Sequence, residues 1–223
     1  MTGDEFLRGG GGRVSVKICG ITNRDDALDA IALGADALGF NLFPGSKRCV
    51  ALDREAEWIA ALPATTARVA VLVNAPLEEA RRVAAHPAIH LVQFHGDEDA
   101  DYCARFAAES ACPFIKALRL SEAAVLDGAD RFSTRHILLD ADAGAAFGGS
   151  GALIDLALAA EFARRQPALT LILAGGLRAE NVAEAVRRVR PAAVDVASGV
   201  EEPGNPRRKS RGRMQEFLEK LAG

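Results

Sequence analysis

Residues 169–199 read LTLILAGGLRAENVAEAVRRVRPAAVDVASG, and this stretch holds one complete unit of the fold. It begins with a short apolar run at 169–174, passes a glycine turn, continues as an amphipathic segment at 179–188, and ends in a second apolar run at 193–197. Short apolar runs that lack clean polar alternation are typical of parallel strands covered on both faces. The stretch therefore predicts a strand, a helix and a second, parallel strand.

The same alternation extends over the chain from Arg13 onward. Eight apolar runs predict strands, at Val14–Cys19, Ala37–Leu42, Arg68–Val73, Leu91–His95, Phe114–Leu118, His136–Asp140, Leu169–Ala174 and Ala193–Ala197. Eight segments with helical spacing follow them, at Asp25–Leu33, Asp53–Leu62, Leu77–Ala85, Asp99–Ala108, Glu122–Leu126, Ile154–Arg165, Ala179–Arg188 and Met214–Leu221. Roughly 26 residues per unit suit a (β/α)8 barrel.

A doubly wound open sheet is the competing fold for such a pattern. It would be favoured by a glycine-rich dinucleotide fingerprint after the first strand, and Cys19-Gly20-Ile21-Thr22 is not one. We therefore expect an α/β fold made of a single (β/α)8 TIM barrel over residues 13–223. Residues 1–12 contain four consecutive glycines, Gly9 to Gly12, and we expect a flexible N-terminal tail there.

Composition limits the class of protein. Apolar residues make up 49% of the 223 residues and charged residues 26%, which is typical of a soluble globular domain. The net charge of −3 and the 5% of aromatic residues give no reason to expect nucleic-acid binding. No run approaches the roughly 20 apolar residues of a membrane span, and the N-terminus lacks the apolar run of a secretory signal. The four cysteines show no paired spacing, so we expect free thiols in a reducing cytoplasm.

Active sites of such barrels lie at the carboxyl ends of the strands. Of the residues that the predicted strands present there, Cys19 and Asp140 are the most reactive, since a thiol can act as a base or nucleophile and a carboxyl group as an acid. Each also has a structural interpretation. A lone cysteine is often a small buried apolar residue, and a lone aspartate often caps the next helix.

Three glycine turns follow the last three predicted strands, at Phe147–Gly151, Ala174–Leu177 and Ala197–Val200. In barrels a phosphate is often bound by the loops after strands seven and eight and by a nearby helix N-terminus. Glycine lets several backbone N–H groups approach the phosphate oxygens closely, although one such turn alone would indicate only a tight bend. Three of them in succession predict a phosphate site.

The loop after the second predicted strand, Pro44–Cys49, carries adjacent cations at Lys47 and Arg48. An arginine there could bind a carboxylate through two hydrogen bonds, and a solvated basic loop is the structural alternative. His95 shares its strand parity with Gln93 and is interpreted as a structural hydrogen-bonding partner. The remaining histidines have no metal-ligand spacing, and we expect no metal ion.

The residues resemble the phosphoribosylanthranilate isomerase family of tryptophan biosynthesis over almost all of residues 14–204. The motifs that carry the resemblance occur in the family's order: Val16–Thr22, Gly34–Phe40, Ser46–Arg48, Val73-Asn74, Gln93–Gly96, Leu138–Asp140, Gly148–Gly151, Ala174–Leu177 and Val194–Glu201. Each motif alone is weakly specific, because glycine turns recur among phosphate-binding barrels. Their complete series makes the resemblance specific.

The resemblance implies an Amadori rearrangement of N-(5-phosphoribosyl)anthranilate to the aminodeoxyribulose phosphate, without a cofactor. By this similarity Asp140 is the general acid that protonates the furanose oxygen, and Cys19 is the general base that takes the proton from ribose C2. Arg48 corresponds to the arginine that binds the anthranilate carboxylate. The phosphate-binding residues implied are Gly148, Gly149, Gly175, Gly176, Ser198 and Gly199.

Two further expectations concern the neighbours of these groups. Lys17 shares a strand face with Cys19, and closure of the barrel would bring strand eight beside strand one, so we expect Asp195 to pair with Lys17 as an ionic layer beneath the site. Asp142 has the same strand parity as Asp140 and is the rival general acid. The resemblance selects Asp140 because it directly follows Leu138-Leu139.

The chain departs from the family at two places. Ile154-Asp155-Leu156 replaces an aromatic sequence, and Asn205–Ser210 stands where a Lys-Asp pair is usual, so the extra basic residues there either strengthen phosphate binding or are solvated. The alternatives are another phosphosugar-binding barrel, such as an epimerase, or a non-catalytic metabolite sensor. An epimerase would call for metal ligands at several strand ends, and a silent relative would lack Cys19 or Asp140. We expect a monomer, with a homodimer as the alternative.

Overall fold

The computed structural model describes residues 6–7, 13–120, 127–141 and 153–222. Eight parallel strands pair in sequence order and close into a barrel, because β1 pairs with both β2 and β8. The strands are β1 (Ser15–Cys19), β2 (Ala37–Asn41), β3 (Ala67–Leu72), β4 (Leu91–Phe94), β5 (Phe114–Leu120), β6 (His136–Ala141), β7 (Thr170–Leu173) and β8 (Ala193–Val196). The expected TIM barrel and all eight of its strands are confirmed.

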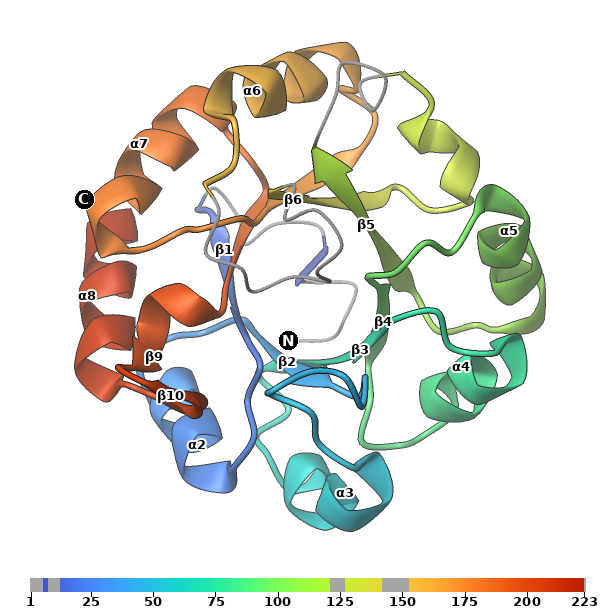
Figure 1. The fold of residues 1–223 in the computed structure, drawn as a ribbon, viewed down its shortest axis with the longest axis horizontal. Coiled ribbons are helices and arrows are strands. Elements are labelled where there is room, and N and C mark those ends of the chain that lie inside the picture. The colour runs from blue at the N-terminus through green and yellow to red at the C-terminus, as the bar shows by residue number, and fades with distance from the viewer. Residues whose placement is uncertain (1–5, 8–12, 121–126, 142–152, 223) are drawn as a thin grey trace.

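Helices surround the ring of strands (Figure 1). They are α2 (Arg24–Ala32), α3 (Leu52–Ala60), α4 (Leu77–Ala84), α5 (Ala100–Glu109), α6 (Leu156–Arg165), α7 (Ala179–Val189) and α8 (Arg211–Ala222). The helix expected at Glu122–Leu126 lies outside the described residues. Between β5 and β6 the structure describes a 3-10 helix, η2 (Ala129–Phe132). None of the described helices is long and apolar enough to cross a membrane.

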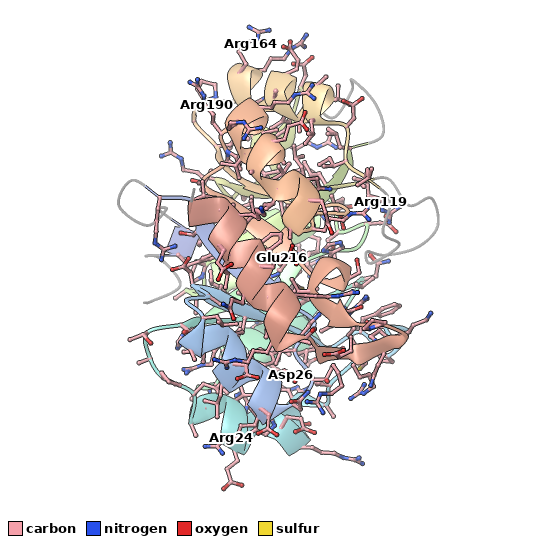
Figure 2. All side chains as sticks on the ribbon, turned by 90° about the vertical axis from the view of Figure 1, so that its left-hand side faces the viewer. Arg24, Asp26, Arg119, Arg164, Arg190 and Glu216 are labelled. Atoms are coloured by element: carbon pink, nitrogen blue, oxygen red, sulfur yellow. The ribbon has the colours of Figure 1, made fainter. Side chains whose placement is uncertain are left out.

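Two features after β8 were not expected. A 3-10 turn, η3 (Ser198–Val200), leads into an antiparallel hairpin of β9 (Glu201–Glu202) and β10 (Asn205–Lys209). Strand β10 of this hairpin contains most of Asn205–Ser210, the second of the two places at which the chain departs from the family. In the side view of Figure 2 the hairpin lies on the same, right-hand side of the molecule as the labelled Arg119, which stands near the carboxyl end of β5.

The apolar core has two parts, because side chains of a strand point alternately to opposite faces. The larger part packs between the strands and the helices. The smaller part fills the inside of the barrel and includes Ala37, Ala67, Leu91 and Ala193, which are the first residues of their strands. Because side chains alternate along each strand, a residue at a strand end points either into the barrel mouth or outward to the helices.

Phe6 and Leu7 belong to the inner cluster, and each is only 1% exposed. Figure 1 shows this short segment inside the ring of strands. These two residues depart from the flexible tail expected over residues 1–12, because their apolar side chains pack inside the barrel. The other residues of that stretch lie outside the described part of the chain.

Candidate active site

Cys19 is the last residue of β1, and its side chain shares the inner face of the barrel with Lys17. Glycine at position 39 on the neighbouring β2 makes the room for this arrangement. A Cβ atom built on Gly39 would lie 2.7 Å from the Cys19 Sγ and 3.1 Å from the Lys17 Cε. The absence of a side chain at Gly39 therefore allows both groups to occupy the barrel mouth beside β2.

Beneath the thiol lies the ion pair that closure of the barrel predicted. Lys17 and Asp195 are register partners on β1 and β8, and the Lys17 Nζ donates to the Asp195 Oδ1 at 2.8 Å. The side chains are 0% and 8% exposed, so the pair is a buried ionic layer. The expected pairing of Lys17 with Asp195 is confirmed.

The titration of Cys19 reflects these surroundings. Burial raises the pKa of the thiol above its ordinary value, and the Asp195 carboxylate raises it further. The cations of Lys17 and Lys209 lower the pKa without reversing the net rise. A thiol in this environment needs its neighbouring cations, or a ligand, to hold a larger thiolate fraction at neutral pH.

Asp140 lies on β6, at the same rim of the barrel as Cys19. Its Oδ1 accepts the backbone N–H of Ala141 at 2.8 Å, and its Oδ2 lies 3.2 Å from the His95 Nε2. The side-chain amide of the fully buried Gln93 lies 2.8 Å from the other ring nitrogen, Nδ1, of His95. With the amide N–H of Gln93 donating to Nδ1, the His95 Nε2 carries the hydrogen and donates to Asp140. His95 is thus a hydrogen-bonding partner, as the sequence indicated, and its partner is the predicted general acid.

A buried ion pair fixes the loop that follows His95. The Lys116 Nζ donates to the Glu98 Oε2 and to the Gly96 carbonyl oxygen, both at 2.8 Å. Glu98 also accepts the backbone N–H groups of Asn74 at 2.8 Å and of Gly96 at 2.9 Å. These contacts stabilise one wall of a cavity of about 700 Å³, which His95 and Asp140 line together with Arg119. The size is in the range of small-molecule sites.

Arg48 lies in the loop after β2, over the end of β1. Gly20, with φ +77°, permits this approach, since a Cβ there would lie 2.4 Å from the Arg48 Cδ. Two nitrogens of the guanidinium bind one carboxylate, with Nε donating to the Glu201 Oε1 at 2.5 Å and Nη2 donating to the Glu201 Oε2 at 3.0 Å. Glu201 therefore fixes the plane of the cation while leaving three N–H donors that it does not use.

Loops after β7 and β8 enclose a second cavity, of about 410 Å³. Its lining includes Gly176, Ser198, Gly199, Arg178 and Arg213, together with the carboxylates Glu180 and Glu216. A Cβ on Gly199 would lie 2.1 Å from the Leu177 carbonyl oxygen, so only glycine lets the two loops approach this closely.

The remaining predicted phosphate residues are placed differently. Gly175, with φ +91°, packs against β6, where a Cβ would lie 2.6 Å from the Ala141 N, and it does not line the 410 Å³ cavity. Gly148 and Gly149 lie outside the described residues, as does Asp142, the rival acid. In the part of the chain that is described, no three His, Cys, Asp or Glu side chains are grouped as metal ligands.

The sequence missed two contributors to this rim: Glu201 as the partner of Arg48, and Lys209. Glu201 was visible only as the last residue of the Val194–Glu201 motif, with no role attached. Lys209 stands in a basic segment, where nothing in the pattern separates a buried lysine from a solvated one. Strand parity places Gln93 and His95 on one face, as the sequence indicated, and the structure adds the 2.8 Å contact between their side chains.

Comparisons with known proteins agree with this architecture. The family model described as N-(5'phosphoribosyl)anthranilate (PRA) isomerase matches residues 16–220. The N-(5'-phosphoribosyl)anthranilate isomerase of Neisseria meningitidis serogroup C is 43% identical over 191 residues, which are 85% of this chain and 88% of that protein.

Solved structures are similar as well. The phosphoribosyl anthranilate isomerase of Thermotoga maritima superposes with a TM-score of 0.83 at 36% identity, covering 94% of this chain and 99% of that one. A phosphoribosyl anthranilate isomerase in complex with reduced 1-(o-carboxyphenylamino)-1-deoxyribulose 5-phosphate superposes with a TM-score of 0.80, at the same identity and coverage. The chain therefore belongs to the family of N-(5'-phosphoribosyl)anthranilate isomerases, enzymes of tryptophan biosynthesis.

Proposed function

We propose that this chain converts N-(5'-phosphoribosyl)anthranilate to 1-(2-carboxyphenylamino)-1-deoxyribulose 5-phosphate by an Amadori rearrangement with general acid–base catalysis. The observation that carries the proposal is the placement of Cys19 and Asp140 at the ends of β1 and β6, on one rim of the barrel. The reaction needs one acid and one base acting on a single pentose. A structural neighbour holds the reduced form of this product, which supports the same substrate class here.

Asp140 supplies the acid in this mechanism. Its proton goes to the furanose ring oxygen, the bond between that oxygen and C1 breaks, and the nitrogen lone pair forms a protonated Schiff base with C1. The cavity beside Asp140 gives the sugar access to the carboxyl group. The hydrogen bond from His95 holds the side chain at the cavity wall, so that its proton is aimed at one position.

Cys19 supplies the base. Its thiolate takes the proton from C2, the released electron pair forms the C1–C2 double bond, and the electrons of the C–N double bond return to nitrogen. The resulting enolamine gives the ketone when the C2 hydroxyl loses its proton and C1 gains one. A base whose pKa lies near the working pH is the most efficient, and the neighbouring cations offset part of the rise that burial gives to the pKa of the Cys19 thiol.

Recognition of the two anionic ends of the substrate completes the proposal. Arg48 binds the anthranilate carboxylate with the donors that Glu201 does not use. The phosphate is bound by backbone N–H groups of Gly176, Ser198 and Gly199, which line the 410 Å³ cavity, and the resemblance adds Gly148 and Gly149, outside the described residues. We expect no metal ion and no cofactor, since every step is a proton transfer.

Fluorescence of the anthranilate group measures turnover directly. We expect the purified protein to consume phosphoribosylanthranilate, and Cys19→Ala and Asp140→Asn each to lower kcat by roughly 10²–10⁴-fold. Asp142→Asn is the matched control and keeps its activity. An inactive Asp142 variant beside an active Asp140 variant would reassign the acid, and a wild-type protein that binds a product analogue without turnover would be a sensor.

We also propose that the enzyme works as a monomer in the cytoplasm. Its four cysteines are free thiols, which suits a reducing compartment. Among the described residues, Leu153 is the large apolar side chain that is exposed, at 62%, which offers little apolar surface for a partner. Sedimentation velocity of the full chain tests the oligomeric state, and a concentration-independent dimer would contradict the proposal.

A further inference from the structure

The β9–β10 hairpin delivers a buried lysine to the barrel mouth. Lys209 closes β10, and its side chain is 0% exposed although four of the five residues of the strand are polar or charged. Its Nζ donates to the Ala197 carbonyl oxygen at 3.1 Å and to the Glu201 Oε1 at 3.0 Å. The basic segment therefore sends one cation inward, while Arg207 and Arg208 remain exposed or paired at the surface.

One shared hydrogen-bond acceptor, Glu201, connects Lys209 to Arg48, the predicted carboxylate-binding arginine. The Glu201 Oε1 that accepts from Lys209 also accepts from the Arg48 Nε, so the two cations share one oxygen. Arg48 alone has a flexible side chain with several rotatable bonds, and a carboxylate held from behind limits that freedom. Lys209, Glu201 and Arg48 form a continuous chain of charged hydrogen bonds that sets the position of the guanidinium.

The same lysine acts on the predicted base. The charged groups around the Cys19 thiol come from four elements: Lys17 on β1, Asp195 on β8, Arg48 after β2, and Lys209 on β10. Lys17 and Asp195 act in opposite directions on the pKa of Cys19. Lys209 lowers it. Burial lowers the pKa of Lys209 itself, and the Glu201 carboxylate opposes that effect without reversing it. An ammonium group at the same rim of the barrel as a thiol favours the thiolate.

The hairpin is anchored well enough to hold this lysine in place. The Lys209 backbone N–H donates to the Asp26 Oδ2 at 2.6 Å, and the Arg208 Nε donates to the Asp26 Oδ1 at 3.1 Å. Asp26 is buried on α2, which Figure 2 shows beside α8. The Arg207 Nη1 donates to the Cys49 carbonyl oxygen at 3.0 Å, which ties β10 to the loop that carries Arg48.

We propose that Lys209 is a positioning residue of the isomerase: a buried cation that fixes Arg48 through Glu201 and stabilises the Cys19 thiolate. The proposal rests on the proposed function for the part that concerns substrate. It gives a role to a residue of the basic segment Asn205–Ser210, for which the sequence offered phosphate binding and solvation as the two interpretations. Lys209 itself does not touch the reacting atoms.

Alkylation of Cys19 tests, without any turnover, whether Lys209 stabilises the Cys19 thiolate. The rate of modification by iodoacetamide is followed against pH on the full-length protein, and the tryptic peptide 18–24 reports Cys19 as its single cysteine. Lys209→Met shifts the apparent pKa of Cys19 upward by roughly one unit, so its reactivity near neutral pH falls about tenfold. Lys209→Arg keeps the wild-type profile, because the charge is retained. Cys49, in peptide 49–54, is the internal control.

Steady-state kinetics test whether Lys209 positions Arg48 for substrate binding. Lys209→Met raises KM and moves the acidic limb of the pH dependence of kcat/KM upward by the same roughly one unit, whereas Lys220→Met, at an exposed site on α8, changes neither. Should Lys209→Met not fold, Lys209→Gln, a neutral donor to Glu201, replaces it. Unchanged alkylation and kinetic profiles in the folded variant would overturn the proposal. A wild type without turnover whose Cys19 profile still depends on Lys209 would instead remove the proposed function alone.

Discussion

Replacing Phe6 and Leu7 together by alanine tests whether the two rims of the barrel have separate roles, with packing at one rim and chemistry at the other. Both side chains are buried in the inner cluster with Ala37 and Leu91, each the first residue of its strand. Cys19, in contrast, is the last residue of β1 and so stands at the opposite rim. The double variant therefore removes apolar contacts from the amino-terminal rim and leaves the predicted chemistry untouched.

The size of the effect follows from burial and from chain entropy. Burying a Phe and a Leu side chain stabilises the fold by about 3–6 kcal/mol together. Ordering the backbone of two residues costs about 2–4 kcal/mol, and this cost is recovered when the segment detaches. We therefore expect the double variant to lose about 1–2 kcal/mol of unfolding free energy. For a chain of this length that loss lowers Tm by roughly 2–8 °C.

Urea unfolding of the double variant, followed by circular dichroism, measures the loss, and the fluorescence assay measures kcat/KM on the same preparation. Leu153→Ala is the matched control, because Leu153 is 62% exposed and its truncation changes stability by less than about 0.5 kcal/mol. An unchanged urea midpoint would show that Phe6 and Leu7 do not stabilise the barrel. A tenfold fall in kcat/KM at unchanged stability would show that the segment acts on the site.

Three substitutions at the other rim complete the set. Gly39→Ala places a methyl group 2.7 Å from the Cys19 Sγ and displaces the thiol, so kcat falls at least about 100-fold while thermal unfolding confirms that the variant folds. His95→Asn removes a hydrogen bond to the Asp140 carboxylate, worth about 1.5–3 kcal/mol, so kcat/KM falls roughly 10–100-fold with little change in KM. Lys17→Met leaves its carboxylate partner buried and unpaired, so urea unfolding shows a loss of about 3–5 kcal/mol. A fully stable Lys17 variant with a large loss of turnover would contradict its assignment to the ionic layer.

The strands were readable from the sequence because burial on both faces leaves a simple signal. In β3 all six residues are buried, and the pattern ARVAVL reflects that environment directly. The Lys17–Asp195 pair was also predictable, since closure of an eight-stranded barrel fixes which strands are neighbours. In both cases the decisive constraint is local to a strand or follows from the topology alone.

The hairpin was not readable for the opposite reason. Residues 205–209 read NPRRK, with no apolar alternation, and Lys209 is buried by charge pairing with Glu201, 8 positions away along the chain. Phe6 and Leu7 form a two-residue apolar patch before four glycines, too short for any periodic pattern. A sequence pattern detects burial that repeats along a segment. A single ion pair, or two apolar side chains packed inside the barrel, can be identified only from the three-dimensional structure.

The buried Lys209–Glu201 pair is better explained by chemistry than by stability. A buried ion pair contributes little net stability compared with apolar side chains of similar volume, because desolvation offsets the attraction. Lys209 with Glu201 nevertheless lies at the rim that carries the thiol, while the opposite rim contains Phe6 in an apolar cluster. Burial raises the pKa of the Cys19 thiol, and the Lys209 ammonium opposes that rise in part. The Lys209–Glu201 pair thus gives up packing where the base needs a cation, and apolar packing closes the rim where no proton moves.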